Sequence, residues 1–185
     1  MGKNKYYIIL GVGILGLFAA LVLPGLQKDN QVEQQLQVVP SKSNSSSMQN
    51  SQLTLSLAPG SKTIKKGEVL EVSVQAETAR PLLAIDLHIA YDGRYLELMD
   101  MSPGDMFENP ITLANKKDNQ AGTALYSLGS TKVSKQKGRL ARLTFKALAP
   151  YDKSIVTISQ KSVASSEGGQ KVPIILSNQG IYSVY

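Results

Sequence analysis

Short stretches in which apolar and polar residues alternate fill the chain from residue 53 to its end. Leu53-Thr54-Leu55-Ser56-Leu57 and Ile85-Asp86-Leu87-His88-Ile89 show the pattern most clearly. A period of two places apolar side chains on one face of a β-strand, and glycine interrupts nearly every gap between the stretches. No segment in this part repeats apolar residues with helical spacing over a useful length. The pattern therefore predicts an all-β fold with little helix.

About nine strands are expected between residues 53 and 185. They are Leu53 to Ala58, Val69 to Ala76, Leu83 to Tyr91, Leu96 to Met101, Thr123 to Gly129, Leu140 to Leu148, Ile155 to Gln160, Lys171 to Leu176 and Ile181 to Val184. This number of short strands in about 130 residues suffices for two sheets packed face to face, so we expect one β-sandwich domain over residues 53–185.

A long uncharged run near the N-terminus predicts a membrane anchor over residues 1–26. Lys3 and Lys5 precede the run YYIILGVGILGLFAALVL, from Tyr6 to Leu23, which as a helix would rise about 27 Å and cross a bilayer. The positive-inside tendency holds the lysines in the cytoplasm and places the rest of the chain outside. The alternative is a signal peptide whose cleavage releases a secreted protein, but no small-residue cleavage pattern follows the run.

Residues 27–52 differ in composition from both neighbours. This stretch is rich in Gln, Ser and Asn, includes Pro40, and carries few apolar residues that would form a core. We expect a disordered, flexible linker with a root-mean-square span of about 25–30 Å, which would hold the domain close to the lipid but clear of it.

Charge and residue inventory exclude several classes of function. The chain has 20 Lys and Arg against 14 Asp and Glu, a net charge of +6, but its basic residues are scattered, and no basic helix with interleaved aromatic residues occurs. A nucleic-acid partner is therefore not expected. The absence of cysteine excludes disulfides and thiol chemistry. His88 is the only histidine, no G-x-S-x-G motif surrounds a serine, and no calcium-loop motif is present, so we expect no enzyme, no metal site and no cofactor.

The segment from Tyr91 to Asp105 resembles the cohesin family. In that family a strand ends on Tyr-Asp, as at Tyr91-Asp92, the next strand opens with Leu-Glu, as at Leu96-Glu97, and a Pro-Gly-Asp turn follows, as at residues 103–105. The likeness extends over roughly residues 53–185, and Gly138-Arg139-Leu140 is similar to the start of the family's sixth strand. Two positions depart from the pattern: Gly93 stands where proline is common, and Ala84 where asparagine is common. The resemblance implies a jelly-roll-like sandwich with a non-catalytic docking role.

Cohesins bind dockerins, small calcium-loaded helical modules, through a face built mainly from the third, fifth, sixth and eighth strands. If the apolar set of each strand points inward, alternation predicts which side chains point outward on the matching strands here. The expected partner-binding residues are Asp86, His88, Leu125, Leu140, Arg142 and Lys146. Together they would form a surface of two leucines ringed by polar groups, as in many protein interfaces.

Two other functions remain open at the level of sequence. Polysaccharide-binding modules share this architecture, but they usually grip their ligand with a row of exposed aromatic residues, and this chain has no Trp and only scattered Tyr. A structural subunit of an envelope or secretion assembly, docking another envelope protein by strand pairing, is the other alternative.

Overall fold

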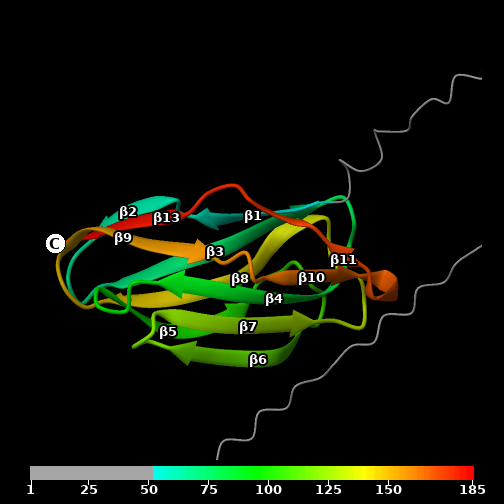
Figure 1. Ribbon diagram of the computed structural model, residues 1–185, viewed down its shortest axis with the longest axis horizontal. Helices are drawn as coiled ribbons and strands as arrows, with labels where there is room; N and C mark the ends of the chain where they lie inside the picture. The colour runs from blue at the N-terminus through cyan, green and yellow to red at the C-terminus, as the bar shows by residue number, and fades with distance from the viewer. Residues whose placement is uncertain (1–51) are drawn as a thin grey trace, which may run out of the picture. The chain divides into compact units, whose positions relative to one another are not determined.

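The computed structural model describes residues 52–185, which form two β-sheets packed face to face (Figure 1). The strands are β1 Leu53–Ala58, β2 Ser61–Ile64, β3 Val69–Thr78, β4 Leu82–Tyr91, β5 Leu96–Pro103, β6 Ile111–Asp118, β7 Thr123–Gly129, β8 Lys137–Ala147, β9 Tyr151–Ile158, β10 Val163–Ser166, β11 Lys171–Val172, β12 Ile174–Leu176 and β13 Gly180–Val184. The helical content of the described part is one short 3₁₀ turn, Glu167–Gly169. The predicted all-β sandwich is confirmed.

One sheet has five strands and the other has eight. The five-stranded sheet has the order β12-β1-β3-β8-β5. In the eight-stranded sheet β4 is central: β7 and then β6 lie on one side of it, and β9 and β10 pair with successive parts of its other side. Figure 1 shows β4, β7 and β6 side by side. All pairings are antiparallel except β1 with β12 and β2 with β13.

The core lies between the sheets and follows the alternation in the sequence. Along β4 the side chains of Ile85, Leu87, Ile89 and Tyr91 are buried, and those between them are half-buried or exposed. The opposite sheet contributes Leu143 and Phe145 of β8, and the Tyr91 and Phe145 rings meet edge to face with centroids 5.3 Å apart. The apolar face of each sheet is thereby removed from water, which is the main favourable term in folding.

Thirteen strands replace the expected nine for identifiable reasons. All nine expected segments form strands, but the segment 171–176 divides at Pro173 into β11 of one sheet and β12 of the other. The strands β2, β6 and β10 were not predicted. Seven of the eight β6 residues are exposed, because this strand lies at a sheet edge and covers little of the core, so no alternation marks it.

The predicted anchor at 1–26 and almost all of the predicted linker at 27–52 lie outside the described residues. Within residues 52–185, no helix has the length and apolar character needed to cross a bilayer.

Residues of the segment from Tyr91 to Asp105 fix the conformation of loops at the ends of the sheets. A Cβ atom at Gly93 would overlap the backbone oxygen of Asn119, and one at Gly104 would overlap that of Arg139. The Asp105 carboxylate accepts a 2.8 Å hydrogen bond from the backbone N–H of Arg139, which helps to hold the pKa of Asp105 below its usual value. This segment therefore encodes tight turns of the scaffold.

Candidate partner-binding face

The outer side of the eight-stranded sheet brings together three of the predicted site residues. Asp86 and His88 point away from the core on β4, and His88 lies directly opposite Leu125 of β7 in the strand register. Asp86 is exposed, whereas His88 and Leu125 are half-buried. These three residues therefore share one surface, as predicted.

Exposed apolar side chains flank this group on the neighbouring strands. Ile111 of β6 lies opposite Gly129 of β7, and Val163 of β10 lies opposite Asp86. The side chains of Ile111 and Val163 are both almost half exposed. Leu113, at a bulge in β6, is 65% exposed. Its side chain lies over Gly129, because a Cβ atom added at Gly129 would be 3.2 Å from the Cδ1 atom of Leu113. We call this surface the β4–β7 face. It is defined by Asp86, His88, Ile111, Leu113, Leu125 and Val163.

Sequence reasoning missed Ile111, Leu113 and Val163. β6 is exposed along almost all of its length, and β10 is only four residues long with small residues, Ala164 and Ser166, at its buried positions. The sequence did carry one signal for this surface: Ile111 and Leu113 are large apolar residues in an otherwise polar segment.

The prediction that Arg142 and Lys146 share a face with Asp86 is wrong. Both residues lie on β8, which belongs to the five-stranded sheet, so their side chains point to the opposite side of the sandwich. There the Arg142 Nε atom lies 3.0 Å from a carboxylate oxygen of Glu71 on β3. The error arose because local alternation does not reveal the sheet to which a strand belongs.

The prediction that Leu140 is exposed is also wrong, because its side chain is only 1% exposed. Val74 of β3 pairs with Ala141, and the next residue, Gln75, pairs with Arg139, so Leu140 is the extra residue of a β-bulge. A bulge interrupts the alternation of side chains, and here Leu140 and Ala141 both enter the core.

The two outer sides of the sandwich differ in chemistry. On the five-stranded sheet, Glu71 pairs with Arg142 and Glu77 with Lys137, so two pairs of opposite charges meet across neighbouring strands. Three large apolar residues of this sheet are markedly exposed, Val69, Met99 and Ile175, and they lie on three different strands. On the β4–β7 face, Ile111 and Leu113 of β6 lie beside β7, which carries Leu125, and Val163 of β10 lies on the other side of β4.

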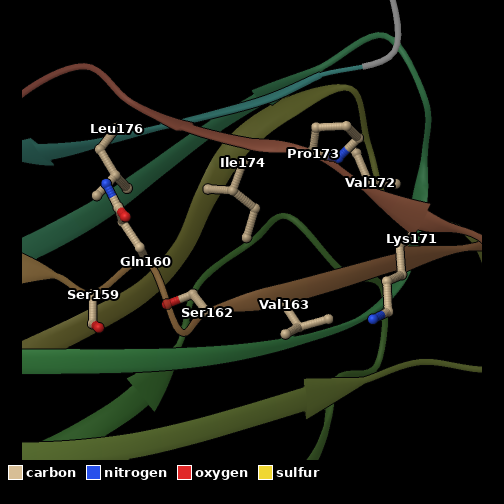
Figure 2. A pocket seen from close by; sticks show the side chains of 9 residues that line it. All are labelled: Ser159, Gln160, Ser162, Val163, Lys171, Val172, Pro173, Ile174 and Leu176. Atoms are coloured by element: carbon tan, nitrogen blue, oxygen red, sulfur yellow. The ribbon is translucent and has the colours of Figure 1, made fainter.

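A hollow of about 540 Å³ opens at the side of the sandwich, away from the centre of this face. Its lining includes Ile174 and Leu176 of β12 and Ser162 and Val163 at the start of β10. In Figure 2 the side chain of Ile174 projects toward the segment that carries Ser162. Lys171 is the one ionisable residue of the lining, so the hollow offers no acid–base pair.

The β4–β7 face has the chemistry of a contact surface. Within residues 52–185, no three His, Asp or Glu side chains gather as a metal site would require. The backbone N–H of His88 donates a 3.0 Å hydrogen bond to Ser162 Oγ, which ties β4 to the turn between β9 and β10. The face thus combines apolar groups with the carboxylate of Asp86, the imidazole of His88 and the ammonium group of Lys116, which lies opposite Leu125 in the strand register.

The fold is that of an all-β, two-sheet sandwich with one partly apolar outer face. The family model of the cohesin domain matches residues 55–181. The chain therefore belongs to the cohesin family. No curated protein sequence is similar enough to match it.

Solved cohesin structures share the fold. A non-cellulosomal cohesin from Archaeoglobus fulgidus superimposes with a TM-score of 0.62 at 18% identity, over 72% of this chain and 91% of that one. The sixth cohesin of scaffoldin B from Acetivibrio cellulolyticus, solved with a Cel5 dockerin, gives 0.61 at 21% identity, over 72% and 99%. A type I cohesin–dockerin complex from Clostridium thermocellum gives 0.61 at 14% identity, over 72% and 93%.

Proposed function

We propose that this protein is a membrane-anchored, extracytoplasmic docking module that binds a dockerin-type protein through its β4–β7 face and has no catalytic role. The observation that carries the proposal is the clustering of Ile111, Leu113, Leu125 and Val163 on one outer side of the sandwich. Apolar side chains exposed on adjacent strands and bordered by polar groups are typical of protein interfaces.

The solved relatives support the choice of partner. Two of them, from Acetivibrio cellulolyticus and Clostridium thermocellum, were solved as complexes with dockerins. A dockerin would bring its own calcium, so this chain needs no metal ligands for the interaction.

Anchoring and location are supported by the N-terminal sequence. Lys3 and Lys5 before the uncharged run from Tyr6 to Leu23 favour an uncleaved helix with the domain outside the cytoplasm. Cell fractionation tests this part: the full chain is expected in the membrane fraction, and a chain lacking residues 1–26 is expected to leave it. Recovery of a shortened chain in the medium would instead indicate signal cleavage.

Calorimetric titration of residues 52–185 against calcium-loaded dockerin proteins of the same organism tests docking. The core of this fragment is built from its own strands, so it is expected to fold without the N-terminal part. Saturable binding is expected, and Leu113→Arg is expected to weaken it by tenfold or more, since a charge would enter an apolar contact.

Val69→Arg provides the matched control. Val69 is 56% exposed on β3 of the opposite sheet, so this change adds the same charge at a similar site and should leave binding unchanged. Failure to bind every dockerin tested, or equal losses in the two variants, would reject docking through this face.

A further inference from the structure

A second hollow lies where β4 ends and β9 begins, and its volume of about 520 Å³ lies within the range of small-molecule sites. Its lining includes Ala90 of β4 and Tyr151 and Lys153 of β9. Asp92 and Arg94 in the turn after β4, and Gln120 in the turn after β6, complete the polar rim. Three separate segments of the chain thus meet around one depression.

Tyr151 gives this hollow an aromatic wall. Its ring stacks on that of Tyr95, with centroids 4.0 Å apart and planes only 4° from parallel. Tyr95 supports one side of the Tyr151 ring and is not part of the lining, whereas Tyr151 lines the hollow and remains 41% exposed. The stack therefore holds a partly open aromatic surface in a fixed orientation.

Arg94 and Asp92 place hydrogen-bonding groups beside that surface. The Arg94 Nε and Nη2 atoms donate to the two carboxylate oxygens of Asp92 at 3.0 and 2.7 Å. The guanidinium also lies over the Tyr95 ring, 5.2 Å from its centroid. This arrangement leaves the Nη1 donors of Arg94 and further lone pairs of Asp92 for a ligand, and Lys153 adds a positive charge to the lining.

We propose that this hollow binds a sugar unit of an oligosaccharide or polysaccharide. A pyranose ring presents C–H groups that pack on an aromatic face, and its hydroxyls both donate and accept hydrogen bonds, which suits a rim of Asp92, Arg94 and Gln120. Lys153 would attract a small anion, but the Asp92 carboxylate would repel it and Arg94 is already paired, while a purely apolar ligand would desolvate the ion pair without compensation. The site does not depend on the docking role proposed above.

Titration of the full chain with cellohexaose, xylohexaose, mannohexaose and chitohexaose tests the proposal, in a detergent without a sugar headgroup. The chain lacks Trp, so ligand stacking on tyrosine is visible in tyrosine fluorescence and can be compared with calorimetry. Saturable binding to at least one sugar is expected. No binding to any of the four at millimolar concentration would overturn the proposal.

Variants locate the site. Tyr151→Ala is expected to weaken binding by about tenfold or more. Tyr185→Ala, which removes a 63% exposed tyrosine outside the hollow, should leave binding unchanged. Gln120→Ala alters the rim without touching the tyrosine stack, and a severalfold loss is expected there even if Tyr151→Ala folds poorly. Unchanged affinity in Gln120→Ala, or in a folded Tyr151→Ala, would overturn this location.

Discussion

The hydroxyl of Tyr91 donates a 2.6 Å hydrogen bond to the Oδ1 atom of Asn119, which also accepts one from the backbone N–H of Leu98 at 2.9 Å. Tyr91 ends β4 of the eight-stranded sheet, Leu98 lies on β5 of the five-stranded sheet, and Asn119 follows β6. One amide side chain therefore joins the two sheets on the side of the sandwich where β5 and β6 lie. Nearby, Asn115 Nδ2 donates to the backbone oxygen of Met101, and Lys117 Nζ donates to that of Met99.

Replacement of Asn119 by alanine is expected to lower the free energy of unfolding by about 1–3 kcal/mol. The change leaves the buried Tyr91 hydroxyl and the Leu98 N–H without their acceptor, and unsatisfied buried polar groups are costly. Urea unfolding followed by circular dichroism measures the loss. The neighbouring exposed residue provides a control, since Gln120→Ala should change stability little; equal losses in the two variants would contradict the assigned role of Asn119.

The sequence predicts strands well where they bury one face and poorly where they do not. β1 and β7 have the predicted bounds because alternation continues to their ends, whereas the exposed edge strand β6 escaped notice. Of the residues predicted to bind a partner, Asp86, His88 and Leu125 lie on one outer face, whereas Arg142 and Lys146 lie on the other sheet. Leu140 shows a second limit, because one bulge residue inverts the expected orientation and pairing across strands decides where a bulge forms.

Leu140 provides a stability prediction with a control on its own strand. Leu140→Ala is expected to destabilise the domain by about 2–5 kcal/mol, because the side chain is buried at the bulge and its removal leaves a cavity. Lys146→Ala, at an exposed position of β8, should change stability by less than about 0.5 kcal/mol. Chemical unfolding of both variants measures this contrast, and a small effect at Leu140 would mean that its side chain faces solvent.

Burial raises the pKa of three tyrosines, Tyr91, Tyr126 and Tyr182, which should make the domain sensitive to alkaline pH. Burial raises the pKa of Tyr91 to about 12, with smaller contributions from the negative charges of Asp118 and Glu97, and burial alone raises that of Tyr182 to about 12. The unfolded chain releases these protons near the ordinary value of 10.0, so their contribution to stability is full below pH 10 and is lost as the pH rises through about 12.

Urea unfolding at a series of alkaline pH values measures this effect. Tyr91→Phe should reduce the slope of stability against pH between 10 and 12 by about one proton, because it removes one of the tyrosines with a raised pKa. An unchanged slope in Tyr91→Phe would show that Tyr91 ionises equally in the folded and unfolded chain.

The division of the predicted site between two sheets determines which substitutions should affect a protein partner. Leu125→Glu replaces an apolar contact with a charge, and His88→Glu places a second carboxylate two residues from Asp86 on β4, so each is expected to weaken dockerin binding by about tenfold or more. Arg142→Ala and Lys146→Ala alter the opposite side of the sandwich and should leave affinity within about twofold of the original. Calorimetric titration of the four variants against one dockerin separates the two sides. Loss of affinity in Arg142→Ala with none in Leu125→Glu would place the partner on the five-stranded sheet, because the two residues lie on opposite outer surfaces of one folded domain.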